Sequence, residues 1–110
     1  MDVALTHEAK KLLKELYSTY CDRVANGMLK REAAIFDGAE DIINNVYGDM
    51  NIEDISFVCA ELGRAGLLNN FYGSGIVTAC ELLPEGIAYM ESNFKRTAKG
   101  LIEIVSVLKP

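Results

Sequence analysis

The spacing of apolar residues changes at Gly66 of this 110-residue chain, and the change limits the folds that the chain can adopt. Before Gly66 most apolar residues recur at steps of three and four, which is the period of an amphipathic helix. After it come two β-rich runs, 67–72 and 76–82, joined by Gly73-Ser74-Gly75. Glycines in such a short connection are typical of a hairpin turn. The sequence therefore predicts an antiparallel hairpin that directly follows a helix.

The first helix is predicted over about 6–24, where apolar residues form a single stripe. Thr6 is the expected N-cap, because its hydroxyl can accept a hydrogen bond from a free backbone N–H of the first turn. Asn26-Gly27 is a stop signal, since both residue types tolerate the left-handed conformation that ends helices. The segment 28–36 that follows is predicted to be a short helical turn or a loop.

Two more helices are predicted before the hairpin. The second covers about 39–47 and is separated from the third by the turn 48–50. Asn51 is the expected N-cap of the third helix, and Gly66 closes it. The buried stripe of the third helix is predicted to contain Ile52, Ile55, Val58, Cys59 and Leu62.

The last helix is predicted over about 84–108, because Pro84 is favoured at a first helical position and apolar residues continue to the end. Its apolar stripe is wider than one small core needs, so a partner helix is expected to cover part of it. A twofold homodimer is the commonest closed arrangement. The predicted interface residues are Leu101, Ile104, Val105 and Leu108.

The stretches CAELGRAGLL and ELLPEGIAYME resemble the winged helix-turn-helix superfamily, especially small bacterial PadR-like and MarR-like regulators. Over 39–92 the matching positions are Leu62, Gly66, Leu67, Leu68, Leu82 and Gly86. Leu83 stands where the family usually has a capping threonine. The resemblance implies one α+β, mainly helical domain over 1–110, with three helices, a hairpin wing and a C-terminal dimerisation helix. It also implies a homodimeric transcription regulator that binds double-stranded DNA through the third helix and the wing.

In the DNA-binding hypothesis, polar side chains that point outward from the third helix meet base edges, while residues around it contact the DNA backbone. Ser56 and Arg64 are the candidates for base contacts. The candidates for backbone contacts are Lys30, Arg31, Asn69 and Tyr72.

The charge of the central segment favours a different partner. Residues 37–65 carry seven carboxylates against the single base Arg64, a net charge of −6 within a chain of net charge −5. Affinity for DNA depends largely on neutralising phosphates, so carboxylates on the reading helix oppose it. The alternative hypothesis is an acidic winged-helix module that binds another protein and no DNA. Its candidate contact residues are Glu53, Phe57 and Glu61.

Residues suited to catalysis or to metal and cofactor binding are scarce. The three cysteines are widely spaced, His7 is the single histidine, and Gly73-Ser74-Gly75 lacks the lysine of a phosphate-binding loop. We therefore expect no enzymatic activity, no metal and no cofactor. The sequence also contains no apolar run of signal-peptide or membrane-spanning length, so a cytoplasmic protein with reduced cysteines is expected.

Overall fold

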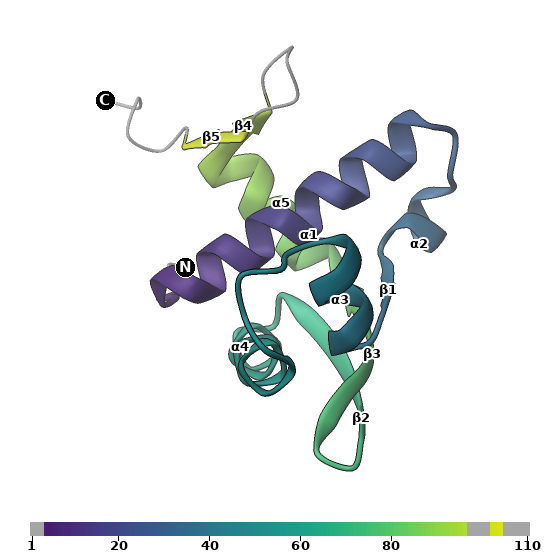
Figure 1. The fold of residues 1–110 in the computed structure, drawn as a ribbon. Coiled ribbons are helices and arrows are strands. Elements are labelled where there is room, and N and C mark those ends of the chain that lie inside the picture. The colour runs from purple at the N-terminus through teal and green to yellow at the C-terminus, as the bar shows by residue number, and fades with distance from the viewer. Residues whose placement is uncertain (1–3, 97–101, 105–110) are drawn as a thin grey trace.

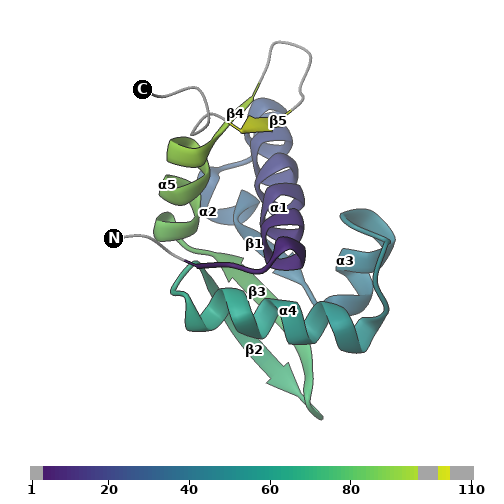
Figure 2. The same cartoon turned by 90° about the vertical axis from the view of Figure 1, so that its left-hand side faces the viewer.

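The computed structural model describes residues 4–96 and 102–104, which form an α+β and mainly helical structure (Figure 1). The helices are α1 (His7–Ala25), α2 (Lys30–Ala33), α3 (Ala39–Asn45), α4 (Ile52–Arg64) and α5 (Pro84–Asn93). The strands are β1 (Ile35–Asp37), β2 (Leu68–Gly73), β3 (Ile76–Leu82), β4 (Phe94–Arg96) and β5 (Ile102–Ile104). α4 lies across the β2–β3 hairpin, and α1 and α5 lie above it (Figure 2).

The predicted hairpin is confirmed, and the structure adds a strand to it. β2 and β3 pair antiparallel with Leu68 opposite Leu82, and Gly75 has a φ of 79° in the connection. β1 pairs with the other edge of β3, which gives a three-stranded sheet in the order β1-β3-β2. Residues 28–36 were predicted as a helical turn or loop. The helical turn is present as α2, but the strand that follows it was missed.

The predicted ends of α1 and α4 are confirmed by their caps. The Thr6 hydroxyl accepts a hydrogen bond from the Ala9 N–H (3.2 Å), and the Asn51 side-chain oxygen accepts one from the Asp54 N–H (2.8 Å). Gly27 and Gly66, which follow α1 and α4, have φ values of 96° and 79°. Glycine adopts this left-handed conformation at little cost. The connection between α3 and α4 covers residues 46–51, longer than the predicted turn.

One hydrophobic core lies between the helices and the inner face of the sheet. The helices contribute their buried residues, and the strands of the three-stranded sheet contribute the residues of one face. Its largest fully buried side chains are Leu12, Leu13, Leu16, Phe36, Ile42, Ile55, Leu62, Leu68, Val77, Leu82 and Met90. The outer face of the three-stranded sheet keeps exposed side chains such as Ile35 and Phe71. The helices thus cover the sheet on one face.

Arg23 fixes the segment that connects α1 to the sheet. Its Nη1 donates hydrogen bonds to the carbonyl oxygens of Ala33 (3.2 Å) and Ile35 (2.8 Å). Its guanidinium carbon lies 4.5 Å from the centre of the buried Phe36 ring, a cation–π arrangement. A single side chain of α1 therefore holds the end of α2 and the start of β1.

The predicted helix over 84–108 is wrong at 94–96 and 102–104, which are strands, while 97–101 and 105–108 lie outside the described residues. It begins at Pro84 as expected, but α5 ends at Asn93 and the chain continues into β4, which pairs antiparallel with β5. In the backbone register of this pair, Phe94 is the partner of Ile104. β-branched residues such as Ile102 and Ile104 suit a strand at least as well as a helix, which explains why the apolar spacing misled.

The two buried cysteines are expected to react slowly with thiol reagents. Cys59 on α4 and Cys80 on β3 are both buried, while Cys21 is partly exposed. A hydrogen bond with the Cys59 thiol and burial raise the pKa of the Cys80 thiol, so its reactive thiolate is disfavoured. In the native protein a maleimide should label Cys21 first. Labelling of Cys59 as fast as Cys21 would contradict the inward orientation of this side of α4.

Candidate functional site

The outward face of α4 differs from the predicted one at two positions. Ser56 was predicted to point outward to DNA, but it is only 6% exposed, and its Oγ accepts a hydrogen bond from the Val77 N–H (3.1 Å). The β-bulge at Phe71/Tyr72 interrupts the pairing of β2 and β3 next to Val77, and the hydroxyl satisfies this buried donor. Ile52 was predicted to be buried, but it is 39% exposed at the first position of α4.

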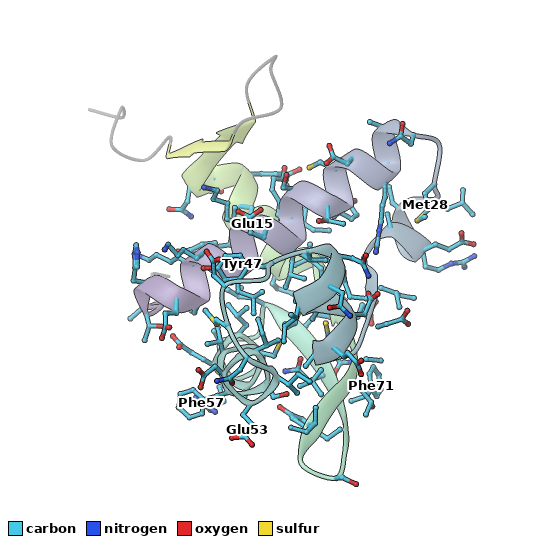
Figure 3. The ribbon with its side chains drawn as sticks, in the orientation of Figure 1. Glu15, Met28, Tyr47, Glu53, Phe57 and Phe71 are labelled. Atoms are coloured by element: carbon cyan, nitrogen blue, oxygen red, sulfur yellow. The ribbon has the colours of Figure 1, made fainter. Side chains whose placement is uncertain are left out.

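Phe57 is the most exposed large apolar side chain within residues 4–93, at 71%. With Glu53 it projects from the outer side of α4, away from the core (Figure 3). Tyr72 on β2 is 55% exposed and lies opposite Val77, so it points to the α4 side of the hairpin. An exposed aromatic residue therefore stands on each of two neighbouring elements.

Phe57 and Tyr72 border a shallow groove of about 370 Å³ between α4 and the hairpin, which we call the α4–hairpin groove. The side chains that line it are mainly apolar, and its one charged residue is a carboxylate. The lining residues are Glu53, Ser56, Phe57, Ala60, Tyr72, Gly75 and Ile76. No lysine or arginine of the described chain lines this groove. Such a surface suits an apolar side chain that is flanked by positive charge.

A larger hollow of about 620 Å³ begins where the α4–hairpin groove ends, because Ile76 lines both. It lies between the start of α3, the start of α4 and β3, and its charged lining residues are Glu40 and Asp41. Ile52 and Ile76 are the functional candidates that sequence analysis missed. Ile52 belongs to the helical stripe by spacing alone, so no signal in the sequence marked it as exposed.

Three of the residues predicted to contact DNA lie around one hollow. Arg64, Asn69 and Tyr72 line a depression of about 300 Å³ where α4 ends and β2 begins. Arg64 and Asn69 are exposed there. The floor is formed in part by Asn70, whose side-chain amide donates a hydrogen bond to the Cys59 carbonyl oxygen (2.8 Å). Asn70 thereby ties the hairpin to α4.

Lys30 and Arg31, predicted as DNA backbone contacts, are exposed but lie far from α4. Both belong to α2, which Figure 1 shows on the opposite side of the molecule from α4. α2 leads into β1, which pairs with the edge of β3 opposite to β2, so Ile35 and Asn69 lie on opposite sides of Glu81 in the sheet. The structure therefore does not bring these two bases to the surface that carries Arg64.

Glu61, predicted as a protein contact, already has partners within the chain. Its two carboxylate oxygens accept hydrogen bonds from the Thr6 N–H (2.8 Å) and the Thr6 hydroxyl (2.7 Å). Glu61 therefore ties α4 to the start of α1, whereas Glu53 and Phe57 are exposed. The protein-interaction candidates thus reduce to two residues on one side of α4.

The predicted dimer interface falls largely outside the described residues. Leu101, Val105 and Leu108 are not among them, and Ile104 is described only as part of β5. The homodimer stays a prediction. Within the described ranges there is no cluster of three potential metal-ligating residues and no helix with the length and apolarity needed to cross a membrane. No protein-family model matches the chain, and neither the curated proteins nor the solved structures gave a match.

Proposed function

We propose that this protein is a protein–protein interaction module with a winged-helix arrangement, and that its α4–hairpin groove binds an apolar segment flanked by positive charge. The observation that carries the proposal is the 71% exposure of Phe57 at the edge of a groove whose charged lining residue is Glu53. Large exposed apolar side chains that gather in one place mark interaction surfaces more often than isolated ones do.

The energetic argument rests on the aromatic side chains. Aromatic rings provide a large apolar area with few rotatable bonds, so they are enriched among the residues that dominate binding. Phe57 and Tyr72 stand on two elements that are tied together by the Asn70 and Ser56 hydrogen bonds. A partner would meet a preorganised groove, which lowers the entropic cost of association.

The charges near the groove favour a basic partner. Glu53 and Asp54 are exposed in the first turn of α4, and Glu40 and Asp41 line the adjoining hollow. Carboxylates around an apolar centre speed the approach of a positive surface and disfavour an acidic one. The same carboxylates repel DNA phosphates.

We expect Phe57→Ala and Glu53→Lys each to lower capture of the partner at least tenfold. Phe57→Ala removes an aromatic side chain that the partner would bury, and such anchors commonly contribute about 2 kcal/mol or more. Glu53→Lys reverses the charge that favours a basic partner. The matched controls are Phe71→Ala and Glu85→Lys. Phe71 is another exposed phenylalanine, seen on the other side of the hairpin (Figure 3). Glu85 is exposed at the second position of α5, as Glu53 is in α4.

The measurement is a quantitative pull-down from cell extract with the full chain and these four variants. A photo-crosslinking residue at position 57 or at position 71 identifies which captured protein touches the groove. A protein that crosslinks at 57, and whose capture falls in the two groove variants alone, supports the proposal. Equal capture by all four variants would refute it.

DNA binding is the second candidate function. It is favoured by the hollow that gathers Arg64, Asn69 and Tyr72 at the end of a helix followed by a hairpin. To test it, the DNA that elutes with the protein in the same pull-down is sequenced. Enrichment of one sequence motif that Arg64→Ala abolishes would establish this function, since a bidentate arginine–base contact contributes about 1–3 kcal/mol of discrimination.

A further inference from the structure

A second exposed apolar patch lies at the corner between α1 and α2. Met28 and Leu29 are exposed there, Leu29 at 60%, and they are followed directly by the exposed bases Lys30 and Arg31. We call these four residues the basic corner. An apolar pair next to two positive charges is the chemistry that the α4–hairpin groove is suited to bind.

The basic corner is held in one conformation by hydrogen bonds. The Met28 N–H donates to the Arg23 carbonyl oxygen (3.0 Å), and the Ala33 N–H donates to that of Leu29 (2.8 Å). Arg23 fixes the far end of α2 through the carbonyl oxygens of Ala33 and Ile35. Leu29 is therefore presented by an ordered backbone, and little conformational entropy is lost if it becomes buried.

Within one molecule the basic corner and the groove cannot meet. Figure 3 shows Met28 on one side of the molecule and Glu53 and Phe57 on the opposite lower side. The two surfaces differ from each other, so contact between them joins two copies head to tail. Such a heterologous contact repeats into a ring or an open chain, whereas a twofold dimer uses the same surface twice.

We propose that the basic corner of a second copy of this chain docks into the α4–hairpin groove, with Leu29 against Phe57 and Tyr72 and with Lys30 and Arg31 near Glu53 and Asp54. This inference rests on the proposed function, because it names one partner of the same groove. Both surfaces are small, so each contact is weak, with a dissociation constant on the order of tens of micromolar. Association therefore depends on protein concentration.

The test uses Phe57→Asp, which disables the groove, and Leu29→Asp, which disables the corner. Both residues are exposed, and circular dichroism checks that each variant is folded. Sedimentation velocity of the wild type at several hundred micromolar should show species larger than a monomer. Each variant alone should be monomeric, whereas Phe71→Asp, a matched change at an exposed aromatic residue outside the groove, should associate like the wild type.

The decisive measurement is an equimolar mixture of the two variants. The intact corner of Phe57→Asp can enter the intact groove of Leu29→Asp. The altered groove and the altered corner cannot bind each other, because their contact would bring two aspartates together. The mixture should therefore form a one-to-one dimer and nothing larger. Head-to-tail docking is overturned if the wild type is monomeric or if the mixture stays monomeric. It is also overturned if both variants still associate on their own, as they would in a twofold dimer that uses another surface. The proposed function fails by a different result, namely no groove-dependent capture of any protein by the wild type.

Discussion

Replacing Phe36 with alanine is expected to lower the free energy of unfolding by about 3–5 kcal/mol, the usual range for a buried phenylalanine. Phe36 lies in the middle of β1, is 1% exposed, and pairs with Cys80 on β3. The substitution leaves a cavity between β1 and the core, and it removes the ring over which the Arg23 guanidinium lies. In a domain of this size the melting temperature should fall by at least about 12 °C.

Thermal unfolding followed by circular dichroism measures this loss, with Phe71→Ala as the control. Phe71 is another strand phenylalanine, but it is 54% exposed on the outer face of the sheet, so its truncation should cost about 1 kcal/mol or less. If Phe36→Ala and Phe71→Ala unfold at nearly the same temperature, β1 does not belong to the core.

Replacing Gly38 with alanine is expected to destabilise the protein by about 3 kcal/mol, at the upper end of the usual cost of overpacking. A Cβ at this position would lie 2.5 Å from the Val77 carbonyl oxygen and 2.9 Å from the Thr78 Cα. Both obstacles are backbone atoms of β3, the central strand. β3 and the start of α3 would have to separate, because no side-chain rotation relieves the contact.

Gly63→Ala is the informative comparison for this prediction. A Cβ there would meet the side-chain amide nitrogen of Asn70 at 2.8 Å, and this side chain can move away at the cost of its hydrogen bond to the Cys59 carbonyl oxygen. Gly63 lies in the last turn of α4, where alanine is favoured over glycine by up to about 1 kcal/mol. Urea unfolding should therefore show a much smaller loss for Gly63→Ala than for Gly38→Ala. Equal losses would mean that the close packing of α3 on β3 is not maintained in solution.

The groove variants and the stability variants separate binding from folding. Glu53 and Phe57 are exposed, so their replacement should change capture of a partner with little change in unfolding. Phe36 packs into the core from β1, and Gly38 lines the large hollow, so replacing either residue should weaken both the stability of the fold and the capture of a partner. Loss of capture without loss of stability is therefore the result that identifies the α4–hairpin groove as a binding surface.

Local signals in the sequence were enough to predict most elements of the fold. Caps such as Thr6 and Asn51 act within one turn of their helix, and Gly66 and Gly75 act at their own backbone positions. The hairpin joins two neighbouring β-rich runs through a short turn, so it too depends on residues that are close in sequence. These interactions depend on residues a few positions apart, which is why spacing and composition reveal them.

Three features depend on tertiary packing alone: the existence of β1, the inward orientation of Ser56, and the separation of the acidic surface of α4 from the basic surface of α2. β1 has three residues, and it exists because Ile35 and Asp37 pair with Glu81 and Ala79, far along the chain. Ser56 points inward because the hairpin brings an unsatisfied N–H to it. The sequence determined how much acidic and basic charge the chain carries. The packing of α4 and α2 on opposite sides decided that Glu53 and Arg31 form separate surfaces, since charges cooperate only where the fold places them together.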